Sequence, residues 1–268
     1  MSKLAHRTGG IVRRNSRLPG DLGAKQEAVA LDCQAVILAG GLGTRMRPTT
    51  ETIPKPMIPV LGKPFLEQQL AMLANAGFSR ALLLVAYLGE KIEEYFGDGK
   101  SLGWNLSYSY EASPLGTGGA LKNAEHKLED DFVLLNGDTF LQIDYPAWWR
   151  AYCESGSSAF IVAYEKSGSA AANLLANKLP NNLAVAPDGR VTAYRKRDPR
   201  ELTHIDAGVL LLRKEALKKI PAGRACSLEE EIFPRLIEEG TMKAWITTEP
   251  FYDMGSAEGL QALEARLA

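Results

Sequence analysis

The sequence predicts an α/β protein built on a mostly parallel β-sheet. Three short apolar runs, at residues 34–40, 81–87 and 132–138, have the length and composition of buried strands. Segments in which apolar residues recur at helical spacing lie between these runs, so strands and helices alternate along the chain. Such alternation is typical of right-handed crossover connections, which leave the strands parallel.

The first half of the chain follows this alternation closely. Residues 64–78 place large apolar side chains at helical spacing, and Gly77 provides a stop signal at the end of the helix. The remaining expected elements of this half are a short helix at 89–99, an alternating strand at 104–111 and a helix at 117–128.

The second half is less regular. The expected elements, in order, are a helix at 144–156, a strand at 158–165, a hairpin at 182–196 that turns at Pro187-Asp188-Gly189, a strand at 204–212, a helix at 227–240, strands at 242–248 and 251–255, and a helix at 256–268. Ser227 is expected to cap the helix 227–240, with Glu230 completing a capping box. Pro234 is expected to kink that helix or to end its first part.

Composition and charge exclude several classes of protein. The 268 residues carry a net charge of −1, which gives no sign of binding to nucleic acid or to an anionic membrane. The three cysteines are far apart in the sequence, which fits a reducing compartment. No stretch reaches the roughly 18 apolar residues of a membrane helix. We therefore expect a cytoplasmic protein that binds small molecules, with a homodimer as one open option for its assembly.

The N-terminal segment differs from the rest of the chain. Residues 1–33 contain six lysines and arginines among glycines and prolines, with little hydrophobic periodicity. We interpret residues 1–33 as a flexible N-terminal extension and residues 34–268 as the folded domain. Within that domain, a first part ends near residue 140 and a second part covers residues 141–268.

The ends of two predicted strands carry the residues with the clearest chemistry. Residues 40–45 follow the first strand and combine glycines with Arg45, while Asn136 and Asp138 end the third strand. Ligands of open α/β sheets bind beyond the carboxyl ends of the strands. Glycines and arginine suit phosphate oxygens, and Asp138 offers hard oxygen ligands to Mg²⁺. Asp253 is a second carboxylate at a strand end.

Taken singly, these features also fit ordinary structure, because acids cap helices and glycines make turns. Residues 40–57 match neither G-x-x-x-x-G-K-[ST] nor G-x-G-x-x-G, so neither common phosphate-binding motif is present. The residues alone therefore predict a phosphate-binding α/β protein without naming the ligand.

A longer pattern adds a resemblance to a known family. The motif G-G-x-G-T-R-[LM]-R-P stands at residues 40–48 and P-K-P at residues 54–56, followed by GKPFLE, EASPLGTGGAL, NGDTF, DAGVLLL and FYDMG. From Gln34 to the end, the chain resembles the sugar-1-phosphate nucleotidylyltransferases. This resemblance implies a Rossmann-like three-layer α/β/α sandwich with a mostly parallel mixed sheet.

The resemblance also implies a reaction and its catalytic residues. Members of that family join a nucleoside triphosphate to a sugar 1-phosphate and release pyrophosphate. By resemblance, Arg45 lies on the β- and γ-phosphates, and Lys55 reaches the α-phosphate or the sugar phosphate. Asp138 and Asp253 are implied to hold Mg²⁺.

Binding residues follow from the same resemblance. The implied nucleotide-binding residues are Leu38, Ala39, Gly40, Gly41, Gly43, Thr44, Glu111, Pro114, Gly116 and Thr117. The implied sugar-phosphate-binding residues are Asn136, Lys196, Asp206 and Gly208.

Specificity is less strongly indicated. Glu111 can only accept hydrogen bonds as a carboxylate, which suits the N1–H and N2–H₂ groups of guanine and favours GTP. The short chain and the segment SLEEEIFPRL most resemble the bacterial D-glycero-D-manno-heptose 1-phosphate guanylyltransferases. A uridylyltransferase acting on N-acetylmuramate or another hexose 1-phosphate is the main alternative. A non-catalytic regulatory homologue is disfavoured, because such proteins usually lose one of the arginine, lysine and metal-binding residues present here.

Overall fold

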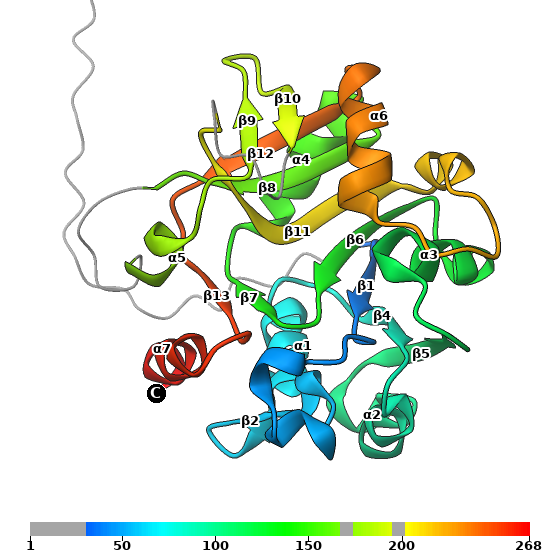
Figure 1. Ribbon diagram of the computed structural model, residues 1–268, viewed down its shortest axis with the longest axis vertical. Helices are drawn as coiled ribbons and strands as arrows, with labels where there is room; N and C mark the ends of the chain where they lie inside the picture. Colours follow the sequence, from blue (N-terminus) through cyan, green and yellow to red (C-terminus); the bar gives the residue numbers. More distant parts are fainter. Residues whose placement is uncertain (1–30, 167–173, 195–201) are drawn as a thin grey trace, which may run out of the picture.

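The structure is a computed structural model that describes residues 31–166, 174–194 and 202–268. A seven-stranded sheet crosses its centre in the order β12-β8-β11-β6-β1-β4-β5 (Figure 1). Its strands are β1 (Gln34–Leu38), β4 (Arg80–Val85), β5 (Asn105–Tyr110), β6 (Asp131–Asn136), β8 (Ala159–Tyr164), β11 (Ile205–Arg213) and β12 (Met242–Thr247). Within this sheet, β11 runs antiparallel to β6 and β8, and all other neighbours are parallel. The predicted mostly parallel mixed sheet is confirmed.

Helices cover both faces of the sheet. The first face packs against α1 (Phe65–Asn75), α2 (Gly89–Phe96), α4 (Tyr145–Ser155) and α7 (Ala257–Leu267), and the second against α3 (Gly116–Asn123) and α6 (Phe233–Glu238). Successive strand residues point to opposite faces, so in β1 Ile37 belongs to the first core cluster and Val36 to the second. The arrangement is the expected three-layer α/β/α sandwich.

The described chain also contains shorter strands and a short helix outside the seven-stranded sheet. They are the pair β2 (Pro59–Val60) and β3 (Lys63–Pro64), the pair β7 (Thr139–Leu141) and β13 (Phe251–Asp253), the hairpin β9 (Leu183–Val185) and β10 (Val191–Tyr194), and the helix α5 (Leu174–Lys178). The hairpin and β13 agree with the sequence. The strand β7 was not expected from the sequence, because three residues are too few to show an alternating pattern.

The helix expected at residues 227–240 forms in two parts. The Ser227 hydroxyl accepts the N–H of Glu230, as predicted for the cap. However, the side chain that returns to the Ser227 N–H is Glu231, at 3.3 Å, and not Glu230. A π-helical turn covers Leu228–Ile232, and α6 then starts with Pro234 in its first turn, where its missing N–H is not needed.

The start of the described chain packs against the domain. The Leu31 and Cys33 side chains are buried, and the Leu31 N–H donates to the Gly77 carbonyl at 3.0 Å. The last three residues of the predicted 1–33 extension therefore belong to the packed domain, because two of them bury apolar side chains. The rest of that prediction falls on residues 1–30, outside the described residues. In the described part of the chain, no helix is long and apolar enough to cross a membrane.

Candidate active site

The carboxyl ends of β1, β4 and β6 open onto a cavity of about 730 Å³. Most of the predicted nucleotide-binding residues line it, namely Leu38, Ala39, Gly40, Gly41, Glu111, Pro114, Gly116 and Thr117. Lys55, Asn136 and Asp138 also line this cavity. The structure thus brings together segments that lie up to a hundred residues apart, at the sheet edge where the strand-end argument placed a ligand.

A glycine allows β6 to end directly beside β1. The Gly137 N–H donates to the Leu38 carbonyl at 3.0 Å. A Cβ at Gly137 would lie 2.3 Å from that carbonyl oxygen, so no other residue fits without moving the backbone. This close approach places Asp138 immediately beyond the edge of the sheet.

Two of the predicted nucleotide-binding residues, Gly43 and Thr44, do not line the cavity. Gly43 adopts φ 59° and its carbonyl accepts the Thr50 hydroxyl at 2.8 Å, which turns the loop away from the sheet. A short 3₁₀ turn (Thr44–Met46) follows, so Gly43 and Thr44 shape the loop instead of facing the cavity. Because of this turn, Arg45 points toward the C-terminal part of the chain.

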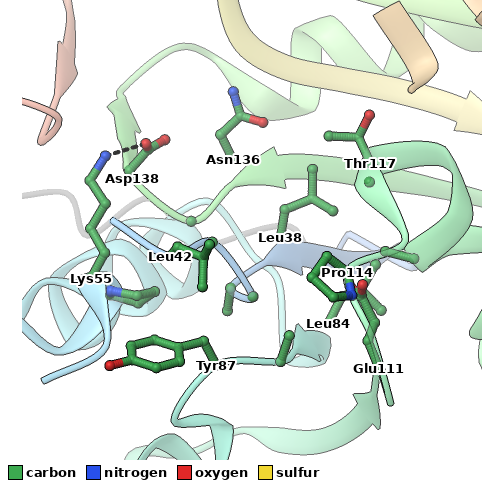
Figure 2. A pocket seen from close by; sticks show the side chains of 18 of the residues that line it. Leu38, Leu42, Lys55, Leu84, Tyr87, Glu111, Pro114, Thr117, Asn136 and Asp138 are labelled. Carbon is green, nitrogen blue, oxygen red and sulfur yellow. Dashed lines mark hydrogen bonds and ion pairs between the residues drawn. The ribbon is translucent and has the colours of Figure 1, made fainter. Parts of the chain in front are cut away.

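Four predicted charged residues meet at one end of the cavity. The Lys55 ammonium pairs with the Asp138 carboxylate, and its Nζ lies 3.8 Å from Oδ1 of Asp253. Nη1 of Arg45 lies 3.8 Å from Oδ2 of the same Asp253. The Lys55 side chain is only 9% exposed, whereas that of Arg45 is 68% exposed. Figure 2 shows Lys55 and Asp138 together on one side of the cavity.

The β7–β13 pair positions the two carboxylates. Asp253 is the register partner of Thr139, the residue after Asp138. The Met254 N–H donates to the Asp138 carbonyl at 2.9 Å, and the Gly255 N–H donates to Oδ1 of Asp253 at 2.7 Å. A short antiparallel ladder therefore joins segments more than a hundred residues apart and fixes both acids at one place.

The donor set at this place fits a magnesium ion. Both carboxylates lie near the Lys55 ammonium, Asp253 also lies near the Arg45 guanidinium, and both acids are partly exposed. Mg²⁺ usually takes one or two carboxylates and completes its shell with substrate phosphates and water. No group of three histidine, cysteine, aspartate or glutamate side chains in the described chain is placed to hold a metal. Asp138 and Asp253 thus suit an ion that binds together with a phosphate ligand.

A buried glutamine supports the turn that carries Asp138. Nε2 of Gln69 donates to the Asn136 carbonyl at 3.0 Å and to the Thr139 carbonyl at 2.7 Å, and the residue is fully buried. Gln69 was not among the site residues expected from the sequence. The sequence feature that could have identified Gln69 is its position: it is a polar residue on the apolar face of α1, directly before Leu70.

Glu111 lies at the opposite end of the cavity from Lys55 (Figure 2). Its Oε2 accepts the Leu115 N–H at 2.8 Å, which closes the turn that follows β5. Burial raises the pKa of the Glu111 carboxyl, and the hydrogen bond from Leu115 partly opposes this shift. The cavity therefore has a charged end and an end lined by a loop with one carboxylate.

Residues 111–117 contain Glu111, the predicted contact to the nucleotide base, and are called the base loop below. They dock against a segment from the second half of the chain. The Gly118 and Gly119 N–H groups donate to the Cys226 carbonyl at 2.9 and 3.2 Å, and the Cys226 N–H donates to the Leu115 carbonyl at 2.8 Å. Gly116 has φ 70°, and a Cβ there would lie 2.8 Å from the Cys226 oxygen. The positive φ and this close contact together require a glycine at position 116.

The family is decided by comparison with known proteins. The model of a family described as nucleotidyl transferase matches residues 34–171. This chain belongs to the nucleotidyl transferase family.

Three similar proteins illustrate the range of this family. A mannose-1-phosphate guanylyltransferase from Mycobacterium tuberculosis is 34% identical over 84% of this chain, which spans 61% of the length of that relative. A D-glycero-alpha-D-manno-heptose 1-phosphate guanylyltransferase from Aneurinibacillus thermoaerophilus is 28% identical over 87% of this chain and 98% of its own length. The crystal structure of HddC from Yersinia pseudotuberculosis complexed with GMP-PN superposes on this chain with a TM-score of 0.74. The two sequences are 28% identical, and the match covers 88% of this chain and 100% of HddC.

The residues predicted for the sugar phosphate lie beside the main cavity of this nucleotidyl transferase. Asn136, Asp206 and Gly208 line a small adjoining cavity of about 30 Å³. Asp206 accepts the Tyr194 hydroxyl and the Gly208 N–H, each at 2.8 Å. Gly208 has φ 73° and lies so close to the Asn136 amide that a Cβ would be 2.9 Å from it. Lys196 lies outside the described residues.

Three further residues border the two cavities and were missed by sequence analysis. Leu42 and Tyr87 line the main cavity, and Glu229 lines the small one. Tyr87 follows the carboxyl end of β4, so the strand-end argument applied to that strand would have found it. Its hydroxyl donates to the Glu51 carbonyl at 3.0 Å, which ties the loop after β1 to the loop after β4. Glu229 had no comparable signal in the sequence.

Proposed function

We propose that this protein joins a nucleoside triphosphate to a sugar 1-phosphate and releases pyrophosphate. The observation that supports this most directly is the polarity of the main cavity. One end gathers Arg45, Lys55, Asp138 and Asp253, and the other end presents the base loop. A nucleoside triphosphate has the same polarity, with a base at one end and a charged phosphate chain at the other.

The proposed reaction is an in-line substitution at the α-phosphate. An oxygen of the sugar phosphate forms a bond to the α-phosphorus, and the bond from that phosphorus to the bridging oxygen breaks. Pyrophosphate leaves with the electron pair of the broken bond. Both reactants are anions, so the main tasks are to neutralise and align them. No general base is required, because the attacking phosphate oxygen is already ionised near neutral pH.

The basic residues are suited to different parts of this task. Lys55 is nearly buried at the cavity wall and is placed to neutralise the reacting phosphates. Arg45 is exposed beyond the cavity lining and suits the far phosphates of the chain, which leave as pyrophosphate. Asp138 and Asp253 would hold Mg²⁺, which when bound reduces the negative charge of the phosphates.

We further propose GTP as the nucleotide and D-glycero-α-D-manno-heptose 1-phosphate as the sugar. The Glu111 carboxylate in the cavity wall supports a base that donates hydrogen bonds, as guanine does. The Aneurinibacillus relative, which this chain covers over 98% of its length, is named for this heptose phosphate, and the similar HddC structure holds GMP-PN. The three free cysteines and the triphosphate substrate favour the cytoplasm.

Two alternatives remain for the substrate pair. The name of the Mycobacterium relative supports mannose 1-phosphate as the sugar. A uridylyltransferase from Synechocystis, 32% identical over 77% of this chain, supports UTP as the nucleotide. Both alternatives retain the same reaction at the α-phosphate.

The test is pyrophosphate release in the presence of Mg²⁺, with five nucleoside triphosphates against a panel of sugar 1-phosphates. The panel contains heptose, mannose, glucose and N-acetylmuramate 1-phosphates. We expect the highest kcat/KM with GTP and the heptose phosphate. Preference for another pair would correct the specificity, and no turnover with any pair would contradict the proposed reaction.

A further inference from the structure

Glu229 connects the base loop to the second half of the chain. Its Oε2 accepts two hydroxyl groups, from Thr117 and from Ser227, each at 2.8 Å. The Thr117 oxygen in turn accepts the Leu228 N–H at 2.9 Å. The hydroxyl of Thr117 is therefore held from two sides by consecutive residues that lie more than a hundred positions away.

The position of this network relates it to both cavities. Thr117 lines the main cavity at the end occupied by Pro114 and Glu111, away from Lys55 (Figure 2). Glu229 lines the small cavity with Asp206. One carboxylate thus borders the space beside the predicted sugar-phosphate residues and binds the last residue of the base loop.

The local backbone around Glu229 is unusual. It lies in the π-helical turn Leu228–Ile232, which precedes α6. Such turns are rare, and they occur frequently at functional sites because the wider turn redirects side chains. In this chain Glu229 faces Thr117, while its neighbour Glu230 is exposed.

We propose that Glu229 is a positioning residue for nucleotide selection, acting through the hydroxyl of Thr117 on the base loop. The inference rests on the proposed function and names a residue that controls the base end of the same site. Discrimination between bases depends on the position of hydrogen-bonding groups, so the loop must be held firmly. Hydrogen bonds to a carboxylate are stronger than neutral ones, which suits this task.

The proposal differs from a general contribution to folding in what it predicts for different ligands. The phosphate end of the cavity lies around Lys55 and Asp138, away from Thr117 (Figure 2). Loss of the Glu229–Thr117 contact should therefore weaken binding of whole nucleotides and leave binding of inorganic pyrophosphate unchanged. A global loss of structure would weaken both equally.

The experiment is a double-mutant cycle with Glu229→Gln and Thr117→Val, using calorimetry to measure dissociation constants for GTP, UTP and pyrophosphate. The cycle isolates the Thr117–Glu229 coupling from every other contact of Glu229. We expect each single variant to raise the dissociation constant for GTP about tenfold, the size expected for one hydrogen bond to a charged group. The double variant should be no weaker than the singles.

Two further variants serve as controls. Thr117→Ser is the conservative variant that keeps the hydroxyl, so it should recover most of the GTP affinity that Thr117→Val loses. Glu230→Gln removes the neighbouring exposed carboxylate and should leave the dissociation constants for GTP and pyrophosphate unchanged. Thermal unfolding of each variant establishes that it is folded, and Glu229→Asp replaces Glu229→Gln if the latter is not, because a shorter carboxylate cannot reach both hydroxyls.

The outcomes separate this inference from the proposed function. Additive losses in the double variant, or equal losses for GTP and pyrophosphate, would overturn the role of Glu229. Turnover of the wild-type protein tests the reaction itself. A wild type that binds GTP and shows the expected coupling, yet turns over no sugar phosphate, would refute the proposed reaction and retain the inference.

Discussion

Lys55 shows how single residues define the charged end of the site. A nearly buried ammonium must be paired, and here it faces two carboxylates from distant parts of the chain. The prolines on either side of Lys55 stiffen its segment, and the residue itself is buried. The sequence predicted all four charged residues because each follows a strand end or belongs to the family motif.

Replacement of Asp138 tests the metal assignment. Asp138→Asn keeps the size of the side chain but removes its charge, so Mg²⁺ should lose one of its two carboxylate ligands. Removing a residue that only hydrogen-bonds to a metal ligand lowers metal affinity or activity about 10–100-fold. Removing the ligand itself should therefore lower kcat/KM at least about 100-fold. Steady-state kinetics and Mn²⁺ titration check this. Near-normal rates in a folded Asp138→Asn protein would refute the assignment.

The pH dependence of GTP binding tests Glu111. Burial raises the pKa of this carboxyl, so it takes up a proton at a higher pH than an exposed glutamate does. The protonated group loses an acceptor, and binding of GTP should therefore weaken as the pH falls through the raised pKa, at a higher pH than for an exposed glutamate.

The matched variant for this measurement is Glu111→Gln. Its amide oxygen can still accept the Leu115 N–H and keep the turn, but it does not titrate. The KM for GTP should be higher than in the wild type near neutral pH and should no longer change over the acidic range. If the KM of Glu111→Gln for GTP equalled that of the wild type at every pH, Glu111 would be excluded from recognition of the base.

At the scale of elements, local signals predicted most of the structure and long-range contacts supplied the rest. The strands and helices of the sandwich follow from apolar periodicity, and the Ser227 cap follows from its position. In contrast, β7 exists because it pairs with β13, a partner more than a hundred residues away. The docking of the base loop on Cys226 is equally invisible in a local pattern. The residues that line the cavity were therefore easier to predict from the sequence than the segments that hold those residues in place.

Gln69 provides a test of how α1 supports the site. Gln69→Leu removes the donor that serves the Asn136 and Thr139 carbonyls, and the free energy of unfolding should fall by about 2 kcal/mol. The turn that carries Asp138 would lose its support, so kcat should fall as well. Gln68→Leu is the control, since that half-buried side chain makes a single 3.2 Å bond to Val60 and should cost less than about 1 kcal/mol. Equal effects of the two changes, measured by urea unfolding, would contradict this role.

At the scale of the whole molecule, the two parts expected from the sequence share one sheet. The predicted division near residue 140 separates β6 from β11, yet the two strands pair over five residues. Both core clusters also contain residues from each side of that division. The residues predicted to bind the nucleotide and those predicted to bind the sugar phosphate therefore lie on a common sheet and core.

This sharing predicts cooperative unfolding. Thermal and urea unfolding should each show one transition, with the same midpoint by tryptophan fluorescence and by circular dichroism. A fragment of residues 31–140 should not fold alone, because it would expose the β6 edge and half of each core. Two resolved transitions, or a folded fragment, would contradict a single cooperative unit.

The contact between the glycines of α3 and the Cys226 carbonyl also limits how nucleotide preference can be exchanged between relatives. In a chimera that carries residues 111–119 of another family member, the grafted segment must fit the backbone of residues 224–226, which lies within contact distance in this chain. Under the proposed function, a change of base preference in this protein would require these two distant segments to be replaced together.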